Sequence, residues 1–137
     1  MAAVRRILVI EGHADVGSTL CALLELWGHS AMLASGGVRG VTQALRHMPD
    51  VIIVDLGLPD LDGCKVVQLI RADARGATPV IVAYSGYAQR EREALEAGCD
   101  AFVLKPEVEQ LASVVKMTRE EAWRFVATAG PVAARRR

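Results

Sequence analysis

The sequence has little of several features that define other classes of protein. Only 4% of its residues are aromatic, and its three cysteines, Cys21, Cys64 and Cys99, contain no CxxC pair. An odd, widely spaced set of cysteines argues against a disulfide framework or a structural zinc site and favours a reducing compartment. No apolar run approaches the ~20 residues of a membrane span, and no signal peptide precedes Glu11. We therefore expect a small cytoplasmic domain with no membrane partner.

The charge balance excludes a further class of function. Basic and acidic residues number 16 each, and three of the basic ones are Arg135, Arg136 and Arg137. Residues 1–134 therefore carry 13 basic against 16 acidic residues, a net charge of −3. Such a mildly acidic body lacks the basic face that nucleic-acid binders present. We expect no nucleic-acid partner.

Short apolar runs alternate along the chain with segments of helical spacing. The runs span 7–10, 51–54, 79–84 and 101–104, with a weaker one at 31–34. Continuous β-branched runs without polar alternation are typical of strands covered on both faces, as in a parallel sheet. Five repeats of strand and helix therefore predict an α/β fold with an open five-stranded parallel sheet and helices on both faces.

The helical segments are recognised from the spacing of their apolar residues. In the first two, this spacing predicts buried faces that include Val16, Leu20 and Leu24, then Val38 and Ala44. In the third, Asp62 is the expected N-cap, because its side chain can accept a hydrogen bond from the first turn.

Polar residues follow four of the predicted strands. They are Glu11 with Gly12, Asp55, Ser85 and Lys105. Since ligands of open α/β sheets bind at the carboxyl ends of the strands, these residues are expected to converge. Together they suit phosphoryl chemistry: Asp55 as the nucleophile, Ser85 as a hydrogen-bond donor, Lys105 as a neutralising charge and Glu11 as a ligand for a bridging cation.

Four segments carry a resemblance to a known family: RRILVI (5–10), VDLGLPDLDG (54–63), TPVIVAYSGY (78–87) and AGCDAFVLKP (97–106). In their order and placement, the chain resembles the receiver domain of two-component response regulators, the CheY-like superfamily, from residue 4 to about 116. The resemblance implies a flavodoxin-like (βα)5 fold. It also implies that Asp55 is the phosphoacceptor, assisted by Ser85 and Lys105.

The same resemblance implies a cofactor, a switch and partners. Mg²⁺ would be held by Glu11, Asp55 and the backbone carbonyl of Gly57. Ser85 and Phe102 match the positions of the family's switch pair, which biases a surface over helix 4, strand 5 and helix 5. A histidine kinase or a phosphotransfer protein would supply the phosphoryl group, and a downstream protein would receive the signal.

The acidic pair after the first strand departs from the family pattern. Members usually carry two acidic residues there, whereas this chain has Glu11-Gly12. Because Gly12 offers no side-chain ligand, and Mg²⁺ prefers octahedral oxygen coordination, we expect weaker metal binding and slower phosphoryl transfer. His13 is an alternative ligand, although imidazole suits softer metals better.

Other interpretations of the motifs are weaker. The glycines around residues 36–40 lack the spacing and the lysine of a phosphate loop. The cluster of Asp60, Asp62 and Gly63 has too few oxygen ligands for an EF-hand. An aspartyl-phosphatase enzyme would place a second aspartate where Gly57 stands, so we expect no turnover of an external substrate and no enzyme.

The last residues form a separate segment. We expect a receiver over residues 4–117 and a helical extension with a basic tail over 118–137. Thr118 and Glu121 have capping-box spacing, so either the fifth helix runs on to Val126 or a new helix begins near Arg119. From Gly130 onward we expect a disordered end. Too few residues remain for a DNA-binding domain, which predicts output through protein contacts.

Two hypotheses for the function remain. The first is a stand-alone receiver that is phosphorylated on Asp55 and signals by docking in a phosphorelay. The second is a pseudo-receiver that keeps the fold and acts as a protein-interaction module without phosphorylation. Retention of Asp55, Ser85 and Lys105 favours the first hypothesis, and the loss of an acidic residue at Gly12 favours the second.

Overall fold

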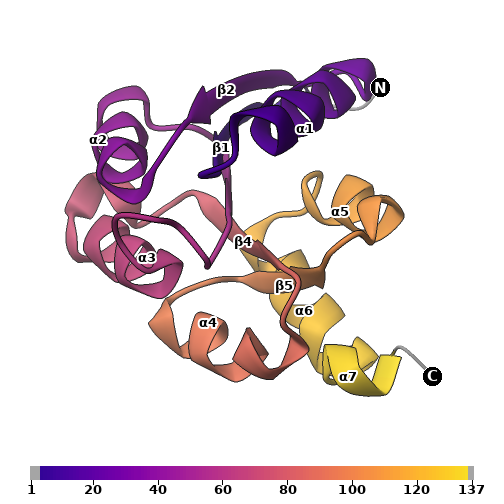
Figure 1. Ribbon diagram of the computed structural model, residues 1–137. Coiled ribbons are helices and arrows are strands. Elements are labelled where there is room, and N and C mark those ends of the chain that lie inside the picture. Colours follow the sequence, from indigo (N-terminus) through magenta and orange to yellow (C-terminus); the bar gives the residue numbers. More distant parts are fainter. Residues whose placement is uncertain (1–3, 136–137) are drawn as a thin grey trace.

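Five parallel strands form one sheet in the order β2-β1-β3-β4-β5 (Figure 1). The computed structural model describes residues 4–135. The strands are β1 (Arg6–Ile10), β2 (Ser30–Ala34), β3 (Val51–Val54), β4 (Val80–Ser85) and β5 (Ala101–Leu104). The helices are α1 (Ala14–Leu26), α2 (Gly37–His47), α3 (Gly63–Ala72), α4 (Glu91–Ala97), α5 (Val108–Val114), α6 (Arg119–Ala129) and α7 (Val132–Arg135), with short 3-10 turns η1 (Ala74–Gly76) and η2 (Ala88–Arg90).

The strand register brings the carboxyl ends of the central strands level with one another. Ile10, the last residue of β1, pairs with Ala34 of β2 and with Val54 of β3, and Ser85 of β4 pairs with Leu104 of β5. The chain order reverses between β1 and β3, which is the point where ligands bind in open α/β sheets. The predicted parallel α/β architecture is confirmed.

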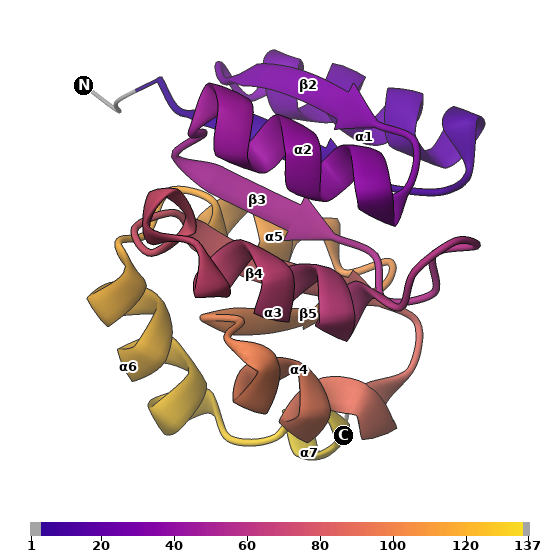
Figure 2. The same cartoon turned by 90° about the vertical axis from the view of Figure 1, so that its left-hand side faces the viewer.

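Helices cover both faces of the sheet (Figure 2). Leu24 of α1 and Leu111 of α5 join one apolar cluster with the strands, whereas Ala44 of α2, Ile70 of α3 and Ala94 of α4 join a second cluster on the other face. Burial of strand residues from both sides explains why their sequences are continuously apolar.

The buried helix faces differ in part from the spacing-based prediction. Leu20, Leu24 and Ala44 are buried as expected, but Val16 and Val38 are 44% and 61% exposed. In α2 the contact with the sheet is made by Gly40 instead, since a Cβ there would lie 2.7 Å from Ile10 side-chain atoms. The absence of a side chain at Gly40 lets the helix approach the sheet closely on this side, while Val38 points outward.

The ends of two helices match their sequence signals. The Asp62 side chain accepts a hydrogen bond from Cys64 N at 2.8 Å and caps α3 as predicted. Thr118 and Glu121 form a complete capping box, with reciprocal bonds of 3.1 and 2.9 Å. Of the two alternatives for this segment, a new helix at Arg119 is therefore the one that forms.

The expectation of a disordered end was wrong for part of the segment. After a turn at Gly130 and Pro131, residues 132–135 form α7. Val132 is buried in the core, and this burial stabilises the short helix. The rest of the predicted basic tail, Arg136 and Arg137, lies outside the described residues. Between residues 4 and 135, no helix has the length and apolar character to cross a membrane.

Candidate functional site

The predicted site residues stand directly after the strands, at one rim of the sheet. Backbone hydrogen bonds hold them there: Glu11 N donates to Ala34 O at 3.1 Å, Asp55 N to Ile10 O at 2.9 Å, and Lys105 N to Ser85 O at 2.9 Å. These bonds continue the sheet by one residue beyond each strand. The side chains therefore start from positions that the sheet itself determines.

Lys105 joins the two carboxylates at this rim. Its Nζ donates to Glu11 Oε1 at 3.0 Å and lies 3.6 Å from Asp55 Oδ1. The Glu11 side chain is 4% exposed and that of Asp55 is 14% exposed, so both charges are largely shielded from water. Gly57 N also donates to Asp55 Oδ1 at 3.3 Å. The structure thus brings together three of the predicted residues in one charged group.

The carboxyl groups of Glu11 and Asp55 shift one another's pKa. Burial and the neighbouring Glu11 carboxyl raise the pKa of Asp55, and the charge of Lys105 offsets only part of this effect. Burial opposes ionisation of Glu11 as well, but hydrogen bonds with Asp55 and Lys105 outweigh it and lower the pKa of Glu11. Two adjacent acids with one nearby lysine leave negative charge that is not fully balanced. This donor set suits a hard divalent cation.

The position expected to supply a second acid is closed. A Cβ on Gly12 would lie 2.7 Å from Pro59 Cδ, so the proline ring of the β3–α3 loop occupies the space of a side chain. His13 does not replace the missing ligand at Asp55. Its ring Nδ1 lies 3.6 Å from Glu11 Oε2 and its side chain is 78% exposed. Any metal at this rim therefore depends on Glu11 and Asp55 for its side-chain ligands among the residues described here.

The two predicted switch residues lie in different surroundings. Ser85 is buried, and its Oγ accepts a hydrogen bond from Tyr87 N at 3.2 Å, which holds the start of the β4–α4 loop. Phe102 has no exposed surface and belongs to the cluster beneath α3 and α4. The structure therefore places Ser85 at the rim and Phe102 in the core.

Sequence reasoning missed a link between the β3–α3 loop and α2. Both carboxylate oxygens of Asp60 accept hydrogen bonds from the helix start, from Gly37 N at 2.8 Å and Val38 N at 3.1 Å. These bonds lower the pKa of Asp60. Because a carboxylate complements the positive end of a helix, Asp60 fixes the loop that carries Pro59 over Gly12. Its distance from α2 in the sequence left no local signal for this role.

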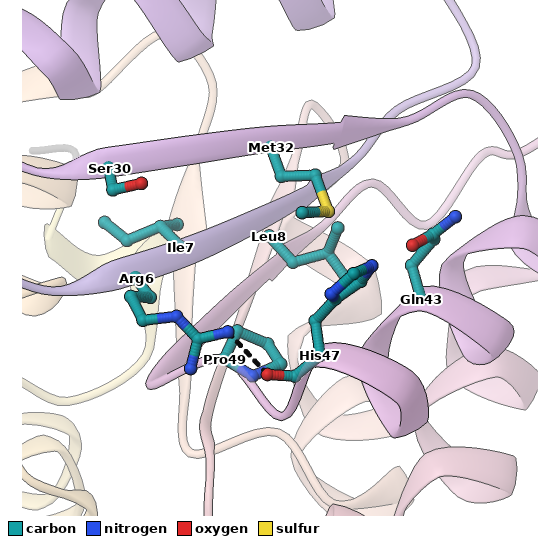
Figure 3. A pocket seen from close by; sticks show the side chains of 8 residues that line it. All are labelled: Arg6, Ile7, Leu8, Ser30, Met32, Gln43, His47 and Pro49. Atoms are coloured by element: carbon teal, nitrogen blue, oxygen red, sulfur yellow. Dashed lines mark hydrogen bonds between the residues drawn. The ribbon is translucent and has the colours of Figure 1, made fainter.

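Two other polar features are occupied by the protein itself. Asp62, Cys64 and Glu93 lie close enough to share a metal ion. However, Arg90 already binds Asp62 and Glu93, each at 2.9 Å, and supplies the positive charge. A shallow pocket between β1, β2 and α2 lies at the opposite end of the strands from Asp55, and there the Arg6 guanidinium donates to the His47 carbonyl (Figure 3).

The arrangement of strands, helices and rim residues defines a class of protein: a CheY-like receiver domain with a flavodoxin-like fold. The response regulator receiver domain family matches residues 7–116. The chain belongs to this family, whose members act in two-component signalling.

Solved structures agree with this assignment. The receiver domain of the sensor histidine kinase PA1611 from Pseudomonas aeruginosa, which holds a magnesium ion in its active site cleft, is 30% identical. It has a TM-score of 0.70 and covers 92% of this chain and 97% of its own. The chemotaxis response regulator CheY4 of Vibrio cholerae is 16% identical with a TM-score of 0.71 over 93% of this chain and all of its own. At 16% identity, the similarity to CheY4 supports only the fold.

Curated relatives are longer proteins. The DNA-binding dual master transcriptional regulator RpaA of Synechocystis is 32% identical over 81% of this chain and 47% of its own length. The transcriptional regulatory protein KdpE of Mycobacterium tuberculosis is 36% identical over 73% of this chain and 44% of its own. The chain thus spans about half the length of these relatives or less, and the similarity concerns their receiver portion.

Proposed function

We propose that this chain accepts a phosphoryl group on Asp55 from a phosphohistidine of a histidine kinase or phosphotransfer protein. In this reaction an Asp55 carboxylate oxygen attacks phosphorus, a P–O bond forms, and the P–N bond to the donor histidine breaks. The departing imidazole keeps the electron pair and takes up a proton. The product is an acyl phosphate, and the chain changes its docking state rather than turning over a small substrate.

One observation carries the proposal: Lys105 Nζ stands between the carboxylates of Glu11 and Asp55, at 3.0 and 3.6 Å. A cation in this position can neutralise charge on the phosphoryl oxygens as the transfer proceeds. It also favours the ionised form of Asp55, which is the nucleophilic form. We assign Ser85, at the end of the neighbouring strand, to donate a hydrogen bond from its hydroxyl group to a phosphoryl oxygen.

We assign the metal role to Glu11, Asp55 and the backbone carbonyl of Gly57. When bound there, Mg²⁺ would offset the negative charge of both carboxylates and of the phosphoryl group. With Gly12 in place of an acid, water has to fill more of the coordination positions. We therefore propose weak binding of Mg²⁺.

We assign the output to protein docking, as a cytoplasmic component of a phosphorelay. The relatives include both DNA-binding regulators and a protein-glutamate methylesterase. The second candidate function is a phosphorylation-independent interaction module, and the observation in its favour is the Pro59 ring that fills the space beside Gly12.

The test is a phosphorylation assay with a small acyl-phosphate donor. The protein is incubated with and without Mg²⁺, and intact mass is followed beside Asp55→Asn. A Mg²⁺-dependent adduct of one phosphoryl group on the wild type alone supports the acceptor function. No adduct at high metal and donor concentrations supports the interaction module instead.

A further inference from the structure

Residues 118–135 lie against the outer side of β5 and form a strap, the name used below for this segment. Strand β5 is the last in the sheet order, and both α6 and α7 pack beside it (Figures 1 and 2). An edge strand presents unpaired backbone groups that another chain can bind, and proteins often cover it with a helix. Here the covering element comes from the same chain.

A buried carboxylate anchors the α6 end of the strap. Asp100 is 1% exposed and accepts hydrogen bonds from Arg119 Nε at 2.9 Å and Trp123 Nε1 at 2.8 Å. On its other side it binds Arg71 Nη2 at 2.7 Å and Ile81 N at 2.9 Å. With two guanidinium groups and two neutral donors, this charge is fully paired, and α6 is firmly attached.

A second carboxylate anchors α7. Glu91, the first residue of α4, accepts hydrogen bonds from Val132 N at 3.0 Å and Arg135 Nη2 at 3.1 Å. Arg135 also donates to Gly130 O at 2.8 Å, and its guanidinium lies 5.4 Å from the Phe125 ring centroid. These contacts hold a helix of only four residues, so α7 depends on Glu91 much more than α6 does.

The apolar contacts of the strap reach both faces of the sheet. Ala122 is fully buried in the cluster beneath α1 and α5, whereas Val132 is buried in the cluster beneath α3 and α4. The strap therefore runs around the edge of the sheet. It covers the surface between α4, β5 and α5, the face that the family resemblance implies as the switch surface.

Two contacts connect α7 with the acceptor rim. Glu91 follows the short turn η2, which begins after Tyr87, the residue whose N–H binds Ser85 Oγ. Val132 and Arg135 line a cavity together with Leu104, the residue before Lys105. The η2 turn of the β4–α4 loop and strand β5 therefore both pack against α7.

We propose that the strap is a built-in occupant of the docking surface and that phosphorylation of Asp55 releases its α7 end. The inference rests on the proposed acceptor function. When Ser85 turns to the phosphoryl oxygen, Tyr87 loses its hydrogen-bond acceptor and the η2 turn moves with Glu91. The contacts of Glu91 with Val132 and Arg135 then weaken, and the population shifts toward a state in which a partner protein reaches β5.

The experiment measures amide hydrogen exchange on the full chain, with and without Mg²⁺ and beryllium trifluoride, which mimics a phosphoryl group on a carboxylate. Binding is recognised by slower exchange in residues 54–60 and 85–87. We expect at least threefold faster exchange in residues 132–135, while residues 119–129 stay unchanged because Asp100 holds them.

A matched pair of variants tests the reverse direction. Glu91→Gln weakens the anchor of α7, whereas Glu96→Gln changes an exposed carboxylate on the same helix. Since coupling between two sites is reciprocal, Glu91→Gln should bind beryllium trifluoride more tightly than the wild type, by at most the factor by which the mimic loosens α7. Glu96→Gln should match the wild type.

The outcomes separate the inference from the function on which it rests. Protection of the acceptor loops, residues 54–60 and 85–87, with unchanged or slower exchange in residues 132–135 overturns the strap mechanism alone. Equal affinity of Glu91→Gln and wild type for the mimic, with α7 loosened in the variant, overturns it too. Absence of any protection at the acceptor loops overturns the acceptor function and the inference together.

Discussion

The ring of Pro59 lies directly over Gly12, where the Cβ of any other residue would come within 2.7 Å of the proline Cδ. The two residues belong to different loops, and the hydrogen bonds of Asp60 with the start of α2 hold the proline in place. The glycine at position 12 and the position of the β3–α3 loop therefore depend on each other. An aspartate cannot be restored at position 12 without moving Pro59.

This contact predicts that Gly12→Asp destabilises the protein. Overpacking of this kind costs roughly 1–3 kcal/mol of unfolding free energy, measured by urea denaturation. Gly86→Ala is the control, since a Cβ there meets no atom within 4 Å. Adding Pro59→Ala to Gly12→Asp should recover most of the loss and raise the affinity for Mg²⁺ in calorimetric titration. A double variant as unstable as Gly12→Asp would show that the proline is not the obstacle.

Lys105→Gln should slow formation of the Asp55 adduct by at least ~10-fold, because it removes the charge that offsets the phosphoryl oxygens. The initial rate is measured by intact mass with a saturating acyl-phosphate donor. Lys65→Gln, on the exposed side of α3, is the matched control and should retain the wild-type rate. Equal rates for both variants would remove Lys105 from the proposed mechanism.

Asp100→Asn should cost about 3–5 kcal/mol of unfolding free energy, because it leaves the buried guanidinium of Arg71 and that of Arg119 without their countercharge. The quantity is obtained from urea denaturation. Asp73→Asn is a suitable control, since it breaks an exposed pair with Arg75 and should leave stability unchanged within error. A small effect for Asp100→Asn would mean that the network tolerates a neutral acceptor.

The protein should lose stability as the pH falls below 6.5, through His29. Its Nδ1 accepts from Arg5 N at 3.2 Å, and its buried Nε2 has no hydrogen-bond partner among the described residues. Burial, followed by repulsion from Lys116 and Arg5, lowers the pKa of His29 from 6.5. The unfolded chain therefore takes up a proton that the folded chain refuses. The contribution of neutral His29 to the free energy of unfolding is complete above pH 6.5 and is lost as the pH falls toward the lowered pKa.

The measurement for His29 is urea denaturation at several pH values between 5 and 7.5. Each titrating group changes the unfolding free energy by at most about 1.4 kcal/mol per pH unit. In His29→Asn the amide oxygen can still accept from Arg5 N, and the slope below pH 6.5 should become shallower. Parallel profiles for the variant and the wild type would show that another group causes the loss.

The fold and the positions of the chemical groups followed from local sequence patterns. Continuous apolar runs determine the parallel strands, since only residues buried from both sides favour such composition. Because each run ends in a polar residue, the convergence of Glu11, Asp55 and Lys105 could be predicted, and the structure places their side chains in contact. Asp62 and the Thr118–Glu121 box were recognisable because capping involves residues only two or three positions apart.

Features that depend on contacts between distant segments were decided by the tertiary structure. Three such contacts join residues that are far apart in the sequence, so that no local pattern predicts them. They are Pro59 over Gly12, Asp60 at the start of α2, and Asp100 between Arg71 and Trp123. The helix α7 forms because Glu91 and the core receive Val132, although Gly130 and Pro131 by themselves indicate a break. The sequence alone determined which groups reach the acceptor rim. Long-range packing decided how much room they have and which surface the chain covers with its own strap.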